Sequence, residues 1–306
     1  MYLTYIMTKN FTKSQLKEKK EFFNKNGFVV FENVLSKNDL NKVRKKYKKI
    51  FKGHYETGVV PDKIKWVYGR DKNNIPRSVC NAWKSDYDVA RVVLSKKIGQ
   101  LVASLQNWAS TRLNQDSLIW VVPGAGSVAF HQDNPYQDWH TPGKVITAWI
   151  PLEDTSKEGA TLEYLIGSHK NGTTKRLNKF FTNQSYRSIS KKLLSNADKF
   201  GRHYVVAKKG SVVFHHGDMW HGSGFNKTKQ DRITLSIHFM NGNSKFHNRV
   251  KNPHFNHYKI FNSSFVYCVW SMGACAPIDQ TLRFRLSIAF GRWAPGPPTP
   301  PREGLW

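Results

Sequence analysis

A histidine and an aspartate stand two residues apart in the segment Phe130-His131-Gln132-Asp133. The segment closes a run, residues 127–132, that reads as a strand. In an extended chain, side chains two positions apart project to the same face, so His131 and Asp133 point together while Gln132 points away. One imidazole nitrogen and one carboxylate oxygen are then aimed at a common point, as in a metal site. An H-x-D pair alone is a weak signal, because it occurs by chance.

More histidines follow in the distant segment GSVVFHHGDMWHGSGFN. His221 comes after a predicted strand and a Gly-Asp turn, where it could supply a third ligand from a neighbouring strand. His215 and His216 compete for this role because they stand close by. Arg232 favours His221, since the polar turn NKTKQD would bring its guanidinium back beside the metal to grip a carboxylate in two parallel hydrogen bonds. We therefore expect His215 and His216 to lie in the core or to contact the metal ligands without binding the metal themselves.

Two imidazoles and one carboxylate are the donor set of the non-haem iron(II) oxygenases, which keep coordination positions open on the opposite face. The three cysteines, Cys80, Cys268 and Cys275, form no C-x-x-C pair and are too scattered for a disulfide framework. The sequence therefore predicts iron(II) held by histidine and carboxylate, and it argues against structural zinc.

The formal net charge of +27 would attract any polyanion. An alternative function is therefore a basic protein that binds nucleic acid or another polyanion on the same fold, without oxygenase activity. Steeply salt-dependent binding with no metal requirement would favour it. The usual nucleic-acid-binding motifs are not visible, so we expect no specific nucleic acid and read the charge as a solvated basic surface.

The motifs, taken in order, resemble those of the phytanoyl-CoA dioxygenase family of iron(II)/2-oxoglutarate oxygenases. The resemblance covers roughly residues 21–239, and it includes NGFVVFENVLS, NAWKSD, HQDNPY, VITAWIPLED, GSHK and WHGSGFNKTKQDRITLSIHF. Its specificity lies in the ordered set of H-x-D, then W-H-G-S-G-x-N, then Arg. The resemblance implies that His131, Asp133 and His221 bind Fe(II) and that 2-oxoglutarate is the cosubstrate.

The resemblance also implies roles for residues around the metal. Arg232 would pair with the distal carboxylate of 2-oxoglutarate, and Ser223 would add a hydroxyl to that carboxylate. Trp149 would lie along the cosubstrate pocket or, as an equal alternative, in the core of the sheet. Tyr136 and Trp139 follow the metal motif on a loop, where they would either line the substrate entrance or pack against the core.

The implied reaction hydroxylates an aliphatic C–H bond of a small-molecule or acyl substrate while 2-oxoglutarate is decarboxylated to succinate. Asp133 favours hydroxylation over halogenation, because halogenating members need a small residue at this position. The sequence does not identify the substrate, although the excess of positive charge hints at an anionic one.

A mostly β scaffold must position these side chains. Short runs rich in Val, Ile, Trp and Phe alternate with Gly, Pro, Asn or Asp. They predict strands near residues 117–122, 127–132, 145–152, 162–166, 212–215 and 233–239. This is the pattern of a double-stranded β-helix, the cupin-like jelly roll, with helices on its outside.

Helices flank the predicted strands on the N-terminal side. Residues 13–51 read as helix, short strand, helix, in which Gly27 ends the first helix and Ser36 or Asn38 caps the second. Residues 89–112 read as one further helix with an apolar face. The polar stretch 171–199 is either a lid or binding loop, or a mobile loop on the surface.

We expect the oxygenase domain to span residues 12–262. Residues 263–306 lack lysine and close with a Pro-rich run, so we expect an atypical, poorly ordered C-terminal tail. The N-terminus shows no secretory signal pattern, and the longest apolar stretch, 265–278, is too short to span a bilayer. These features predict a cytoplasmic protein without a membrane span.

Overall fold

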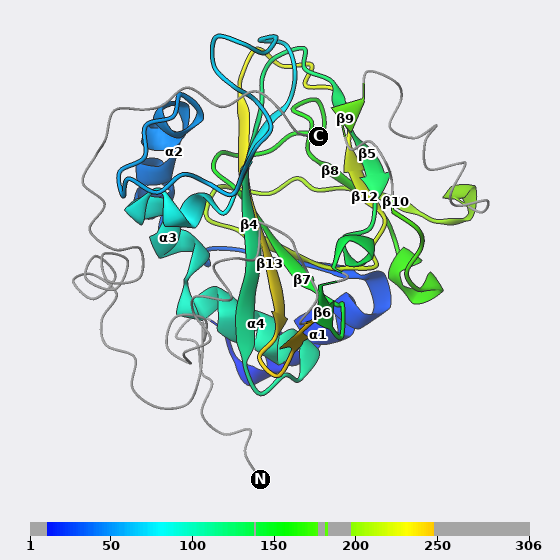
Figure 1. The fold of residues 1–306 in the computed structure, drawn as a ribbon. Coiled ribbons are helices and arrows are strands. Elements are labelled where there is room, and N and C mark those ends of the chain that lie inside the picture. The colour runs from blue at the N-terminus through cyan, green and yellow to red at the C-terminus, as the bar shows by residue number, and fades with distance from the viewer. Residues whose placement is uncertain (1–10, 138, 177–180, 183–196, 248–306) are drawn as a thin grey trace.

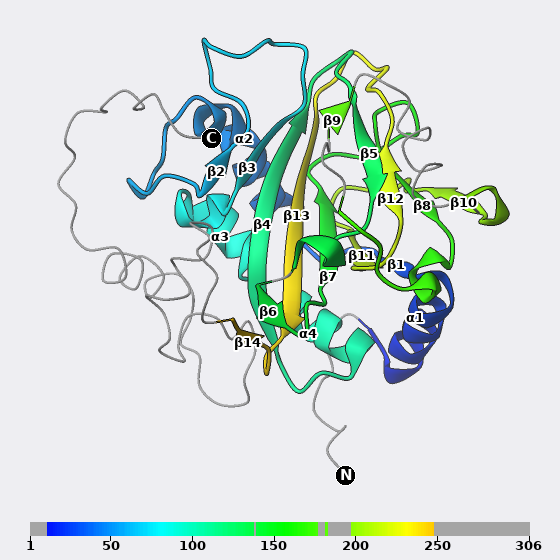
Figure 2. The same ribbon diagram turned by 45° about the vertical axis from the view of Figure 1, so that its right-hand side comes forward.

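The structure is a computed structural model that describes residues 11–137, 139–176, 181–182 and 197–247. Two antiparallel sheets face each other (Figures 1 and 2). The larger has seven strands in the order β1-β11-β7-β13-β4-β3-β2, and the smaller has five in the order β10-β8-β12-β5-β9. The predicted double-stranded β-helix is thereby confirmed.

The larger sheet combines long central strands with short edge strands. Its members are β1 (Phe28–Phe31), β2 (Lys63–Ile64), β3 (Arg77–Cys80), β4 (Thr111–Val121), β7 (Ile146–Pro151), β11 (Val212–His216) and β13 (Arg232–Asn241). The smaller sheet contains β5 (Ser127–His131), β8 (Leu162–Leu165), β9 (Phe181–Thr182), β10 (Arg202–Tyr204) and β12 (His221–Ser223). A separate short ribbon pairs β6 (His140–Thr141) with β14 (Lys245–Phe246).

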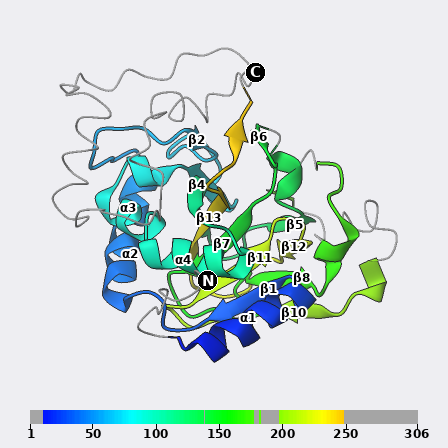
Figure 3. The same ribbon diagram turned by 90° about the horizontal axis from the view of Figure 1, so that it is seen from below.

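Helices cover the face of the larger sheet that points away from the smaller one (Figure 3). They are α2 (Lys37–Phe51), α3 (Tyr87–Val93) and α4 (Lys96–Gln106), while α1 (Lys13–Asn26) packs beside β1. Apolar side chains of these helices and of the sheet form the main core. A second apolar cluster, which includes Trp149 and Tyr164, lies between the two sheets.

Two predicted helix boundaries are confirmed. Gly27 ends α1 in the left-handed conformation at φ 85°, where only glycine is unstrained. Ser36 caps α2, and its hydroxyl accepts a hydrogen bond from the backbone N–H of Asn38.

The single helix predicted over residues 89–112 is wrong. The chain forms α3 and α4 instead, with Ser95 at the N-cap of the second and Asn107 ending it in the left-handed conformation. Thr111 and Arg112 already belong to β4, because this strand pairs with β13 along its whole length. The helical periodicity of the segment did not reveal this pairing, which depends on residues far away in the sequence.

Several expectations concern residues outside the described part of the chain. The predicted domain boundary at residue 262 and the predicted tail 263–306 both lie beyond residue 247, and most of the stretch 171–199 is likewise not described. Among the described residues, no helix has the length and apolarity needed to cross a membrane.

Candidate active site

His131, Asp133 and His221 meet between the two sheets. Each offers one ligand atom, and these atoms lie within 4.8 Å of one another. The Oδ1 atom of Asp133 is 3.6 Å from Nε2 of His131 and 3.8 Å from Nε2 of His221. His131 ends β5, and its register partner on the neighbouring strand β12 is His221. Pairing of these two strands therefore brings together residues that are far apart in the sequence.

His131 and Asp133 point to the same centre and Gln132 points away, as predicted, although the strand β5 already ends at His131. The side chain of Gln132 points away and donates hydrogen bonds to the backbone carbonyls of Gly172 and Asp218. Asp133 itself leaves the strand, and its backbone N–H is anchored by the carbonyl of Gly217 at 2.8 Å. The strand end thus aims the carboxylate at the two histidines.

Both histidines present the same nitrogen to the centre. The Nδ1 atom of His131 lies 2.8 Å from the carbonyl of Ala129, and Nδ1 of His221 lies 2.9 Å from the carbonyl of Met219. Each Nδ1–H therefore donates to a carbonyl and leaves the Nε2 lone pair for a metal ion. Burial lowers the pKa of His131 to about 3, so its imidazole is neutral at physiological pH.

The second carboxylate oxygen of Asp133 is held by three groups behind the centre. Oδ2 accepts a hydrogen bond from the Thr147 hydroxyl at 2.5 Å, and it lies 3.1 Å from Nε2 of His215 and 3.5 Å from Nε2 of His238. Burial alone would raise the pKa of Asp133, but the surrounding histidines outweigh burial and hold it well below its usual value. The carboxylate is thereby ionised and fixed with Oδ1 facing the centre.

His215 and His216, the competing ligand candidates, lie on opposite faces of β11. His215 stands behind Asp133, and its Nδ1 lies 2.8 Å from the hydroxyl of Tyr164. Because His215 must donate through Nε2 to Asp133, Nδ1 accepts the Tyr164 proton, which fixes a neutral tautomer. His216 turns outward, where its Nδ1 accepts a hydrogen bond from the backbone of Asp218. Neither presents a nitrogen to the centre.

Arg232 begins β13 and reaches the same space. The turn before it is built on Asn226, whose side chain bonds to the carbonyls of Val121 and Gln230. The guanidinium is buried, and it donates to the hydroxyls of Thr234 at 3.0 Å and Ser223 at 3.4 Å. Its Nε has no partner within the described part of the chain, and burial lowers the pKa of Arg232 to about 10.

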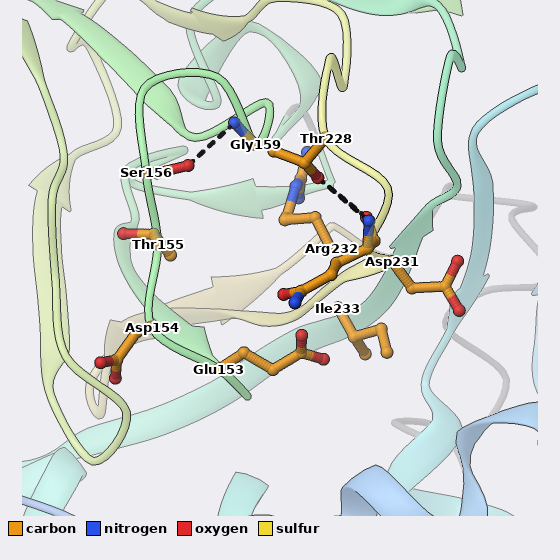
Figure 4. Close-up of a pocket in the computed structure, with 10 residues that line it drawn as sticks. Glu153, Asp154, Thr155, Ser156, Gly159, Thr228, Asp231, Arg232 and Ile233 are labelled. Atoms are coloured by element: carbon orange, nitrogen blue, oxygen red, sulfur yellow. Dashed lines mark hydrogen bonds between the residues drawn. The ribbon is translucent and has the colours of Figure 1, made fainter.

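The turn that delivers Arg232 also borders a small hollow of about 50 Å³ between residues 153–159 and 228–233 (Figure 4). Its acidic wall residue Glu153 pairs with Arg44 at 2.5 Å. A space of this size holds a few water molecules. The hollow is therefore too small to bind an organic substrate.

A cavity of about 520 Å³ joins all the candidate residues. It is lined by the three candidate ligands, by Arg232 and Ser223, and by Trp149, Tyr136 and Trp139. Trp149 lines this cavity and belongs to the apolar cluster between the sheets, while its predicted role toward the cosubstrate stays a prediction. Trp139 lines the cavity and belongs to the main core, whereas Tyr136 is only half-buried at the cavity wall.

Sequence reasoning missed several residues of the site. Thr147, His238 and Tyr164 support Asp133 and His215, and Lys63 and Lys65 line the cavity. His238 and Thr147 lie on strands that were predicted, and strand alternation alone would have placed them on the inner face. Lys63 lies on β2 and Lys65 follows directly after it; a strand of two residues is too short to be recognised from its sequence.

Fold and site together define an iron(II)- and 2-oxoglutarate-dependent dioxygenase. The chain belongs to the phytanoyl-CoA dioxygenase family, whose model matches residues 23–234. Mouse peroxisomal phytanoyl-CoA dioxygenase is 27% identical over 233 residues, which cover 72% of this chain and 67% of that protein. Phytanoyl-CoA dioxygenase domain-containing protein 1 of Danio rerio is 28% identical over 191 residues, covering 61% and 64%.

Solved structures share the fold. The epimerase SnoN, crystallised with Fe3+, alpha ketoglutarate and nogalamycin RO, matches with a TM-score of 0.62 at 17% identity, over 77% of this chain and 87% of that chain. The alpha ketoglutarate dependent carbocyclase SnoK matches with a TM-score of 0.61 at 19% identity, over 82% and 91%. These structures show the fold alone; the family match and the three candidate ligands indicate iron and 2-oxoglutarate as the metal and cosubstrate of this protein.

Proposed function

We propose that this protein hydroxylates an aliphatic C–H bond of a small-molecule or acyl substrate. One observation carries the proposal: three ligand atoms within 4.8 Å of one another and a buried guanidinium line the same cavity. SnoN and SnoK are named an epimerase and a carbocyclase, so the fold alone does not select hydroxylation. The carboxylate of Asp133 favours hydroxylation over halogenation, because it occupies the position that halide would need.

The residues fit both absent groups. Two imidazoles and one carboxylate suit iron(II), and each ligand is oriented by a hydrogen bond on its far side. The Nε of buried Arg232 has no partner among the described residues, and a carboxylate of 2-oxoglutarate would complete its hydrogen bonds. Bound iron and 2-oxoglutarate would supply the oxidising chemistry, with succinate and carbon dioxide as coproducts.

This chain's own residues bind and orient the reactants. His131, Asp133 and His221 would hold the metal ion, while Arg232 and Ser223 would hold the distal carboxylate of the cosubstrate. Trp149 would wall the cosubstrate pocket, and Tyr136 and Trp139 would exclude water from the substrate side. Their apolar rings line the cavity that also contains the candidate ligands.

The test is an anaerobic titration of the full chain with iron(II) and 2-oxoglutarate, followed by oxygen and a metabolite mixture. We expect succinate to form and one substrate to gain a single oxygen atom, as measured by mass spectrometry. Asp133→Ala is the matched control, because it removes one ligand and leaves the cavity otherwise intact. Metal-independent, steeply salt-dependent binding to nucleic acid without succinate formation would instead support the polyanion-binding alternative.

The predicted cytoplasmic location is part of this proposal; the mouse relative is named peroxisomal.

A further inference from the structure

Four polar side chains form one row across the inner face of the larger sheet. Register pairs connect His215 on β11 to Thr147 on β7, Thr147 to His238 on β13, and His238 to Gln115 on β4. All four line the large cavity, as Asp133 does. The ladder between β13 and β4 shifts register directly after His238, and such bulges commonly re-aim a side chain beside an active site. The row therefore brings hydrogen-bonding groups from four strands to the candidate metal centre.

Three members of this row approach the same oxygen of Asp133, but at unequal distances. Its Oδ2 atom is 2.5 Å from the Thr147 hydroxyl and 3.1 Å from Nε2 of His215, whereas Nε2 of His238 is 3.5 Å away. A carboxylate oxygen offers about two lone pairs, and the two closer donors fill them. The contact with His238 is longer than an ordinary hydrogen bond. The N–H group of His238 is therefore not required to hold Asp133 in place.

Gln115 orients the imidazole of His238 from the side away from Asp133. Its amide Nε2 is 3.5 Å from Nδ1 of His238, and because an amide nitrogen only donates, Nδ1 accepts and the ring proton stays on Nε2. Both contacts of His238 are long, as is common for hydrogen bonds that tighten when a substrate binds. Tyr164 orients His215 in the same way, but His215 is only 1% exposed, whereas His238 is 7% exposed. The accessible part of His238 faces the cavity that it lines.

An N–H group in this position favours an oxygen acceptor. The same cavity has apolar walls at Trp139, Trp149 and Leu162, and a donor without a partner in such surroundings costs free energy. Nε2 of His238 lies 3.5 Å from an oxygen of a candidate metal ligand. An oxygen atom that accepts from Nε2 would therefore lie beside the metal centre.

We propose that His238 binds the substrate by donating a hydrogen bond from Nε2 to a carbonyl or hydroxyl oxygen close to the carbon that is oxidised, and that Gln115 positions His238 for this contact. This inference rests on the proposed function, because it concerns the substrate of that reaction. The contact would select molecules with an oxygen acceptor near the reacting carbon over hydrocarbons of the same shape.

The test uses small probes whose proton NMR lines are broadened by bound iron(II), so that the signal reports binding close to the metal. The full chain is loaded anaerobically with saturating iron(II) and 2-oxoglutarate. Each oxygen-containing probe is paired with a hydrocarbon of similar shape: acetophenone with α-methylstyrene, and benzyl alcohol with ethylbenzene. The quantity compared is the oxygen preference, defined as the dissociation constant of the hydrocarbon divided by that of its oxygen-containing partner.

Four variants are compared with wild type. His238→Phe removes the N–H group and keeps an aromatic ring, whereas His238→Gln returns an N–H group at a similar reach. Gln115→Met removes the amide that orients His238. The matched control is His203→Phe on β10, where the histidine does not line the cavity.

We expect the oxygen preference of at least one pair to fall about threefold to tenfold in His238→Phe, as the loss of one neutral hydrogen bond requires. His238→Gln should restore it to within about twofold of wild type, His203→Phe should leave it unchanged, and Gln115→Met should reduce it by at least about twofold. Iron(II) affinity of His238→Phe should stay within about threefold of wild type, because Thr147 and His215 still hold Asp133. A residue that only supports a metal ligand would instead change this affinity about 10–100-fold.

An oxygen preference that His238→Phe leaves unchanged for both pairs overturns the inference, whether or not iron(II) affinity falls. Should His238→Phe fold or load poorly, Gln115→Met decides, since it alters no group that contacts Asp133; an unchanged preference in that variant overturns the inference as well. Failure of the wild-type chain to bind iron(II) and 2-oxoglutarate in the loading step would instead refute the proposed function. The two failures are therefore seen in separate steps of one experiment.

Discussion

Replacing Arg232 by methionine should weaken the binding of 2-oxoglutarate without lowering the stability of the ligand-free protein. Most buried residues stabilise a protein, so their replacement lowers the free energy of unfolding. Arg232 differs because its buried guanidinium donates to two hydroxyls and, among the described residues, forms no ion pair with a carboxylate. We expect Arg232→Met to abolish tight binding of 2-oxoglutarate while the ligand-free protein becomes no less stable.

The magnitudes follow from the burial of the guanidinium. Burial lowers the pKa of Arg232 from 12.5 to about 10, which corresponds to roughly 3 kcal/mol against the charged form at neutral pH. Lost packing and the hydrogen bonds to Thr234 and Ser223 offset part of this. The free energy of unfolding should therefore stay unchanged or rise by up to roughly 3 kcal/mol. Loss of one partner of a buried charge pair costs about 2–5 kcal/mol, so 2-oxoglutarate should bind at least about 30-fold more weakly.

Thermal unfolding with and without 2-oxoglutarate measures both effects. At 100 times its dissociation constant for wild type, 2-oxoglutarate should stabilise wild type by about 2.7 kcal/mol, and the same concentration should stabilise the variant by at most about 0.9 kcal/mol. Arg70→Met, which removes an exposed guanidinium, serves as the control and should behave as wild type does. Unaltered affinity for 2-oxoglutarate in Arg232→Met, or a loss of more than about 2 kcal/mol in the ligand-free variant, would refute the reasoning.

Three further predictions concern the histidines. His221→Ala should reduce succinate production to background, whereas His216→Ala, on the outer face of β11, should retain it; equal loss in both would contradict the assigned ligand set. Tyr164→Phe removes the proton that fixes the tautomer of His215, and we expect iron(II) affinity, measured by calorimetry, to fall about 10–100-fold. An unchanged affinity would show that the contact does not position Asp133. Burial lowers the pKa of His131 to about 3 and that of His215 to about 4, so the unfolded chain binds more protons below pH 6.5. Stability of the metal-free protein should therefore fall as the pH drops from 6.5 to 4, by up to about 1.4 kcal/mol per pH unit for each histidine, and a flat urea-unfolding profile would contradict this.

The sequence predicted the central strands because each carries its own pattern. Alternation and β-branched residues marked β5, β7, β8, β11 and β13 within a few residues of their observed ends. The strands β2 and β3 were missed, and both are fixed by pairing: β3 pairs with β4, and β2 pairs with β3. The helix predicted over residues 89–112 was wrong at its C-terminal end for the same reason. Strand length set by a distant partner is not visible in a local window.

The candidate site was predicted where one short segment contains two of its residues. The alternation of His131 and Asp133 and the polar turn before Arg232 were local signals. Which histidine stands behind Asp133 depends on the register of β11 against β7, where His215 pairs with Thr147. That register is a property of the assembled sheet. The supporting groups therefore emerged only from the structure.

The order of strands in the larger sheet affects how easily the substrate preference of such a protein can change during evolution. The strands β7 and β13, which carry the residues around the metal centre, have neighbours on both sides, whereas β2 has one. A substitution in β13 disturbs two ladders, and a substitution in β2 disturbs a single ladder at the rim. Substitutions in the edge strand β2 can therefore change the end of the cavity that it lines while the residues around the metal centre stay the same.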